Sequence, residues 1–153
     1  MPDPMDHLQT VGEIVQGLRA LGLELVLVGG MALVVLGSRR VTRDFDFVIA
    51  HPGDRLARTI DLFYDRGLEL VSRLNEVGEV ISTIANRKVA AIRLRLDAPA
   101  SAYFFIAETG LRVDLLFDFP IPAAKLAKHA TRTTIRTYVF DIEGNIRAVS
   151  ESA

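Results

Sequence analysis

The stretch that decides the fold runs from Leu27 to Val48 and reads LVGGMALVVLGSRRVTRDFDFV. Near its end stand Asp44 and Asp46, with Phe45 between them. Phenylalanine and valine favour a strand, and residues two apart on a strand point to the same face. The two carboxylates then lie side by side, with their backbones about 6.6 Å apart. Both can therefore converge on divalent cations, and a third acid on a neighbouring strand would complete such a site.

Helical and strand patterns alternate around this stretch. Apolar residues recur at helical spacing before it, and a Gly-Gly pair separates a short apolar run from a second one within it. In chain order the pattern predicts a helix over 6–21, a strand over 23–28, a buried helix over 31–36, a strand over 45–50, and a helix over 54–66 that Asp54 caps and Gly67 ends.

The second half of the chain reads mostly as strands. Residues 68–86 are ambiguous, because their apolar positions fit a helix while Gly78 disfavours one. The remaining segments predict a strand over 91–96, a hairpin of 102–107 with 111–117, a short helix over 122–130, and two strands over 134–149 joined through Glu143-Gly144-Asn145. We expect residues 1–153 to form a single α+β domain, a mixed β-sheet flanked by helices.

Composition narrows the class of protein. The chain has 153 residues, 50% of them hydrophobic, which suits one soluble globular domain. It has no cysteine, its apolar runs are too short to cross a bilayer, and its acidic N-terminus does not resemble a signal peptide. We therefore expect a cytoplasmic protein with no membrane partner. A net charge of −1 argues against a surface coated for nucleic-acid binding.

Two motifs together carry a family resemblance. Gly29-Gly30 followed by RVTRDFDF at 40–47 resembles the polymerase-β-like nucleotidyltransferase superfamily, and within it the toxin nucleotidyltransferases of the AbiEii and MenT type. The resemblance returns at LRVDLLF, residues 111–117, which is similar to the strand that bears the third carboxylate of that superfamily. It implies a nucleotidyltransferase fold and the transfer of a nucleoside monophosphate from an NTP to an acceptor, either tRNA or a protein.

The resemblance also assigns catalytic and metal-binding roles. Asp44 and Asp46 would each ligate two cations, Mg²⁺ or Mn²⁺, and Asp114 would ligate the cation near the acceptor hydroxyl and help to take its proton. Two cations about 4 Å apart suit in-line attack on the α-phosphorus, because they stabilise both the attacking and the leaving oxygen.

The resemblance assigns binding of the triphosphate to residues 29–43, the segment before the two acids. Gly29 and Gly30 would let the backbone approach the phosphates, and the N-terminus of the following helix favours their charge. Ser38 stands nearby with a hydroxyl. Arg40 and Arg43 could clamp phosphate, because a guanidinium stays charged and presents a planar fork of donors.

Each of these motifs also has an explanation that involves no function. Asp118 competes with Asp114 for the role of third acid, and Asp114 could instead be a buried acid satisfied by Arg112. An Asp-x-Asp pair is often only a solvated strand end, and Gly29-Gly30 alone is often only a turn between a strand and a helix.

Three functions therefore remain open. The first is the toxin-like nucleotidyltransferase, with an antitoxin partner and a homodimer as further expectations. The second is a nucleotidyltransferase that modifies a small molecule, as antibiotic-modifying enzymes do. The third is a catalytically degenerate interaction or regulatory module. Related chains continue into a C-terminal helical part with a lysine and an acidic pair, which the residues after Ser150 do not match.

Overall fold

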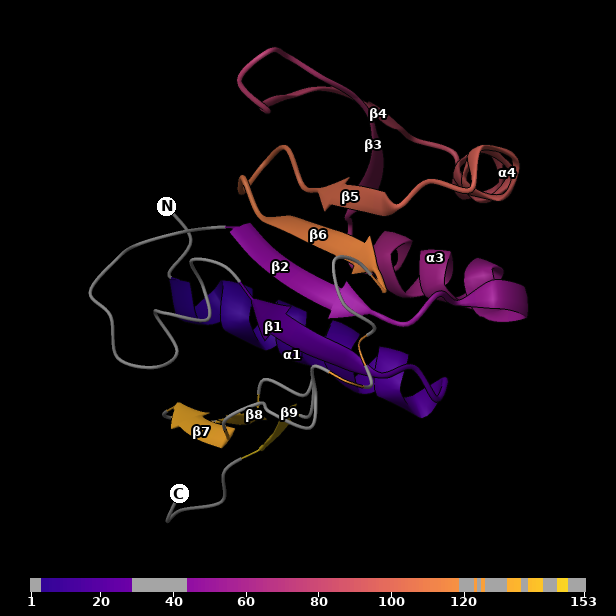
Figure 1. Cartoon of the computed structure of the whole chain (residues 1–153). Coiled ribbons are helices and arrows are strands. Elements are labelled where there is room, and N and C mark those ends of the chain that lie inside the picture. Colours follow the sequence, from indigo (N-terminus) through magenta and orange to yellow (C-terminus); the bar gives the residue numbers. More distant parts are fainter. Residues whose placement is uncertain are drawn as a thin grey trace.

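A six-stranded mixed sheet forms the centre of the molecule (Figure 1). The computed structural model describes residues 4–28, 44–118, 123, 125, 132–135, 138–141 and 146–148. The strand order is β1-β2-β6-β5-β3-β4, and β2 and β6 run parallel while the other neighbours run antiparallel. This confirms the α+β class and the mixed sheet flanked by helices.

The elements before and after the acid-bearing stretch agree with their predictions. Helix α1 spans Pro4–Ala20, and strands β1 and β2 span Leu25–Val28 and Asp44–Ile49. Gly22 follows α1 with a φ of +81°, a conformation that glycine adopts without strain, so the helix ends where predicted. The predicted helix over 31–36 lies outside the described residues.

The next helix begins differently from its prediction. A 3₁₀ turn, η1, spans Gly53–Arg55, and α3 follows over Leu56–Tyr64. The prediction that Asp54 caps this helix is wrong, because Asp54 lies inside the 3₁₀ turn and Arg55 occupies the N-cap position without a side-chain hydrogen bond. Gly67, with a φ of +85°, ends the turn after α3 as expected.

Two segments correct the reading of the middle of the chain. The ambiguous stretch 68–86 is a hairpin of β3, Glu69–Leu74, and β4, Val80–Ile84, with Gly78 at a φ of +84° in its turn. The predicted strand over 91–96 is wrong, since this segment belongs to helix α4, Arg87–Asp97. Asn86 caps α4 by accepting from the backbone amides of Lys88 and Val89.

The predicted hairpin near residue 108 is confirmed. Strands β5, Ser101–Phe105, and β6, Arg112–Phe117, pair antiparallel. Over 134–149 the structure has three short strands where two were predicted, namely β7, Arg132–Ile135, β8, Tyr138–Asp141, and β9, Ile146–Ala148. They form a separate sheet in the order β7-β8-β9. Most of the predicted helix over 122–130, and residues 143–145, lie outside the described residues.

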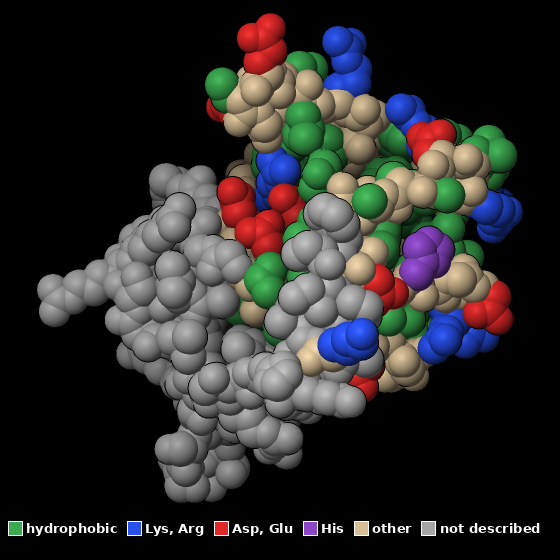
Figure 2. Space-filling model, viewed as in Figure 1, with side chains coloured by type: hydrophobic (Ala, Val, Ile, Leu, Met, Phe, Trp, Pro, Cys, Tyr) green, Lys and Arg blue, Asp and Glu red, His purple; other side chains and the backbone are tan. Residues whose placement is uncertain are grey.

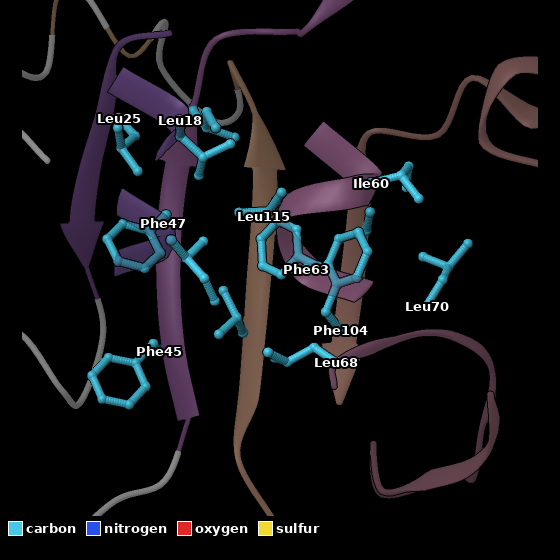
Figure 3. Packing of buried hydrophobic residues seen from close by; sticks show 14 of the residues in the cluster. Leu18, Leu25, Phe45, Phe47, Ile60, Phe63, Leu68, Leu70, Phe104 and Leu115 are labelled. Carbon is cyan, nitrogen blue, oxygen red and sulfur yellow. The ribbon is translucent and has the colours of Figure 1, made fainter. Parts of the chain in front are cut away.

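The core fills the face of the six-stranded sheet toward the helices (Figure 3). At its centre the rings of Phe63 on α3 and Phe104 on β5 stack with their centroids 3.9 Å apart. Phe45 and Phe47 of β2 lie in the same cluster and are almost completely buried. Among the described residues, no helix is long and apolar enough to span a membrane.

Alternation along the strands gives the sheet a second, polar face. On β2 the buried Phe45 and Phe47 alternate with Asp44 and Asp46, because successive side chains point to opposite faces. We call the polar side the acid face. It also carries Asp114 of β6, so the helices and core hold one side of the sheet and the acids occupy the other.

Candidate active site

Three carboxylates gather on the acid face where β2 and β6 begin. The parallel pairing of these strands sets Asp46 opposite Asp114, and Asp44 stands two residues before Asp46 on β2. Figure 2 shows acidic side chains beside a basic one at the place where β2 and β6 begin in Figure 1. We call Asp44, Asp46 and Asp114 the acid row. The prediction that Asp44 and Asp46 share a face near an acid of a neighbouring strand agrees with this geometry.

Burial and like charge both disfavour the charged carboxylates of the acid row. Burial, together with the charges of Asp114 and Asp44, raises the pKa of Asp46 to about 6. Burial also raises the pKa of Asp114, although Arg112 opposes the shift. Because Asp46 and Asp114 are close neighbours on paired strands, the pair binds a proton more tightly than an isolated carboxylate does. A bound cation would relieve this repulsion and displace the proton.

Arg112 ties the acid row to the turn between β3 and β4. Its Nε donates to Oδ1 of Asp114 at 2.7 Å, and its Nη1 donates to the carbonyl oxygen of Gly78 at 2.6 Å. The side chains of Arg112 and Asp114 are only 16% and 13% exposed, so this ion pair is shielded from water. The alternative partner named for Asp114 is therefore present, and it leaves the second carboxylate oxygen outside the ion pair.

Tyr103 extends the row onto a third strand. It lies opposite Asp114 in the pairing of β5 with β6, so Asp46, Asp114 and Tyr103 stand in register across three neighbouring strands. The guanidinium of Arg112 lies 5.0 Å from the centre of its ring. Sequence reasoning missed Tyr103, and the signal that could have found it is the alternation in Ser101–Phe105, which places it on the same face as the acids.

Asp118, the competing third acid, lies at the other end of β6. Four residues along a strand separate its backbone from that of Asp114 by roughly 13 Å. Its carboxylate accepts from the backbone amides of His51 and Ala123, which brace the chain after β6. The geometry therefore sets Asp114, and not Asp118, beside Asp46.

The predicted phosphate-binding residues belong to the connection between β1 and β2. Gly29, Gly30, Ser38, Arg40 and Arg43 all lie outside the described residues. The ends of this connection are described, however, and Val28 at the end of β1 pairs with Asp46. The segment that carries the predicted phosphate ligands therefore starts and finishes beside the acid row.

The residues of the acid row match a divalent cation in charge and donor type. Within residues 4–28, 44–118 and the shorter described segments, no group of three His, Asp or Glu side chains is arranged to hold a metal ion. Yet carboxylate oxygens are the ligands that Mg²⁺ prefers, and burial together with the charges of Asp114 and Asp44 raises the pKa of Asp46. The donor set therefore fits Mg²⁺ or Mn²⁺.

Comparison with known proteins gives a distant structural neighbour but no curated relative. No curated protein sequence matches the chain significantly. A solved structure described as a tRNA-processing enzyme in its apo form has 16% sequence identity to the chain and a TM-score of 0.43. The match covers 97% of this chain and 34% of that enzyme, so the chain spans about a third of the length of the enzyme.

A family model covers most of the chain. It is described as the nucleotidyl transferase AbiEii toxin of type IV toxin–antitoxin systems, and it matches residues 14–151. The match includes both motifs that carry the resemblance and all three residues of the acid row. This chain belongs to the AbiEii nucleotidyl transferase toxin family.

Proposed function

We propose that the chain transfers a nucleoside monophosphate from an NTP to an acceptor hydroxyl, with a divalent cation as cofactor. The observation that carries this proposal is the pairing of Asp46 with Asp114 on parallel strands, two residues from Asp44. Membership of a nucleotidyl transferase family supports the class of reaction.

The three residues of the acid row would bind the cations in different ways. Asp44 and Asp46 would hold both cations, while Asp114 would hold the one nearer the acceptor. Such cations stabilise negative charge on the attacking and leaving oxygens. Arg112 fixes one oxygen of Asp114 and keeps the carboxylate in place, and Asp114 would help to take the hydroxyl proton.

The triphosphate would bind to the connection between β1 and β2. Gly29 and Gly30 would contact it through backbone amides, and Ser38, Arg40 and Arg43 through side chains. Support for these roles is the sequence motif, together with the position of the two ends of the connection beside the acid row.

The family description suggests one partner. Because the family is named for the toxin of type IV toxin–antitoxin systems, we expect an antitoxin to counteract this chain. We expect the acceptor to be tRNA or a protein, with a small molecule as the alternative. Cytoplasmic residence and a homodimer remain predictions.

A second candidate function is a catalytically degenerate interaction module. The ion pair between Arg112 and Asp114 favours it, because this pair satisfies Asp114 without a metal. An interaction module does not need three ionised acids around a cation, so metal-dependent binding of NTP separates the two functions.

Calorimetric titration of each NTP in Mg²⁺ tests the proposal. We expect at least one NTP to bind the wild-type chain, and we expect EDTA, Asp44→Asn and Asp46→Asn each to abolish binding. Asp54→Asn is the matched control, because the Asp54 side chain is 97% exposed on the 3₁₀ turn. Absence of binding to folded wild-type protein, or binding that survives both Asn variants, would reject the proposed function.

A further inference from the structure

A pocket of about 390 Å³ lies between the acid row and the turn that joins β3 and β4. Its walls are formed by that turn and by residues of β2, β4, β5 and β6, namely Asp44, Val77, Gly78, Glu79, Val80, Phe105 and Arg112. In Figure 1 the turn lies on the same side of the molecule as the starts of β2 and β6. The pocket therefore opens directly beside the atoms that the proposed reaction uses.

The turn is braced, so the pocket exists before any ligand binds. Oδ1 of Asn75 accepts from the backbone amides of Val77 and Glu79, and its Nδ2 donates to the Glu79 carboxylate. Arg112 holds the carbonyl of Gly78 from the other side. A pocket with such fixed walls loses little conformational entropy when it binds a ligand.

This pocket lies on the side of β2 that faces away from β1. The predicted triphosphate ligands belong to the connection of β1 with β2, at one edge of the strand order. The pocket extends the opposite way, past β6 to β5 and the turn after β3. An NTP on the first side and an acceptor on the second would meet at the acid row, as in-line attack requires.

A second groove continues the pocket outward along the hairpin. It has a volume of about 510 Å³, and its lining residues are Arg73, Leu74, Asn75, Glu76, Val77 and Ile81. Val77 lines both spaces and is 77% exposed, and Ile81 is also exposed. Apolar side chains presented to solvent beside a polar pocket suit contact with apolar residues of another protein.

Among the residues that the structure describes, the charge around both spaces is negative. Acids outnumber bases, with Asp44, Glu76 and Glu79 in the walls and Asp46 and Asp114 behind them, against the guanidiniums of Arg73 and Arg112. Arg112 is already engaged by Asp114 and Gly78. An NTP with two divalent cations leaves this excess about unchanged, because their charges nearly cancel. Such a surface repels a phosphate backbone and attracts basic residues.

We infer that this pocket binds a serine, threonine or tyrosine side chain of a protein acceptor, whose basic and apolar flanking residues contact the β3–β4 turn. The inference rests on the proposed function and specifies its acceptor. The acceptor hydroxyl oxygen forms a bond to the α-phosphorus, and the bond from that phosphorus to the bridging oxygen breaks. Pyrophosphate leaves with the electron pair, and the hydroxyl proton passes to Asp114.

The test uses synthetic peptides and NTPs labelled at the α-phosphate, in Mg²⁺. Each peptide carries one Ser, Thr or Tyr beside a leucine and two lysines, and total tRNA is assayed in parallel. We expect label in peptides, and we expect Glu76→Lys and Val77→Ser each to raise the peptide KM about tenfold without changing the KM for NTP. Leu96→Ser is the matched control, because Leu96 is 78% exposed on α4, away from the pocket.

The outcomes distinguish a wrong acceptor from a wrong reaction. If calorimetry shows metal-dependent NTP binding but no peptide is labelled, the protein-acceptor inference is overturned while the proposed function stands, and label in tRNA alone overturns the inference in the same way. Peptide labelling that Glu76→Lys and Val77→Ser leave unchanged overturns the assignment of the pocket. Failure of every NTP to bind rejects the proposed function itself.

Discussion

The two faces of strand β2 differ in what they contribute to the stability of the protein. Phe45 and Phe47 are buried against the helices, while Asp44 and Asp46 face the other way. On the core face each side chain gains free energy by leaving water. On the acid face partial burial raises the pKa of Asp46 and Asp114, so those carboxylates are held in surroundings that disfavour their charge. The core face therefore stabilises the sheet, and the acid face weakens it.

Removal of a ring from the core face should have the largest effect on stability. Phe104→Ala deletes one partner of the stacked pair with Phe63, and the cavity should lower the free energy of unfolding by about 3–5 kcal/mol. Urea denaturation measures the loss. The affinity of the remaining folded protein for NTP and Mg²⁺ should not change, and a loss of affinity in fully folded variant would contradict the separation of the two faces.

Arg112 joins the acid face to the β3–β4 turn, so its removal should have the next largest effect. Arg112→Met leaves Asp114 without its ion pair and Gly78 without its donor, and should lower the free energy of unfolding by about 2 kcal/mol. Hydrogen exchange at residues 75–80 should become faster. The control is Arg93→Met, whose exposed pair with Asp97 should contribute less than about 1 kcal/mol. Equal losses in the two variants would show that the turn does not depend on Arg112.

Neutralising Asp46 should stabilise the protein at pH 7. The native pKa of Asp46 is raised from 3.8 to about 6, so the folded state binds its proton more tightly than the unfolded state. The free energy of unfolding therefore falls as the pH rises from about 4 to 6, and the penalty is complete above that range. After allowance for the partial exposure of this group, Asp46→Asn should gain about 1–2 kcal/mol at pH 7.

Denaturation of the wild type and the Asn variant from pH 3.5 to 7.5 measures this effect. The difference between them should shrink toward zero at the acidic end. Added Mg²⁺ should stabilise the wild type at pH 7 and leave Asp46→Asn unchanged. A variant that is less stable than the wild type at pH 7 without metal would show that the acid face is not under electrostatic strain.

The smallest effect sharpens the description of the core face. Asn86 caps α4, which contributes Ala90 and Leu94 to the core. Asn86→Ala removes two hydrogen bonds to backbone amides and should lower the free energy of unfolding by about 1 kcal/mol, with no change in metal binding. Chemical denaturation checks the first value and calorimetry the second. Asn86→Asp, which retains an accepting oxygen, should restore most of the stability.

Sequence reasoning predicted the acid pair because that pair depends only on the period of a strand. Asp44 and Asp46 need nothing beyond β2 to share a face. The register that brings Asp114 to Asp46 joins strands far apart in the chain, so it came from the family resemblance and not from local pattern. The contact of Arg112 with Gly78 could not be predicted, because it depends on where the β3–β4 turn lies in space.

The wrong prediction at α4 has a specific cause. Residues 91–96 alternate apolar and basic side chains as a half-buried strand does, yet Ile92 and Leu96 are exposed on the helix. The buried positions Ala90 and Leu94 are four apart, which is helical spacing, and Asn86 marks the start. The exposed apolar residues Ile92 and Leu96 therefore made the sequence pattern look like that of a strand, although the buried residues have helical spacing.

The parallel pairing of β2 with β6 also sets an order of events during synthesis. Parallel neighbours need a long crossover, and here that crossover contains α3, β3, β4, α4 and β5. Because domains fold as the chain emerges, Asp44 and Asp46 leave the ribosome long before Asp114 does. A nascent or prematurely terminated chain that stops before β6 cannot assemble the acid row, so the complete row forms only after the ribosome has translated the chain as far as Asp114.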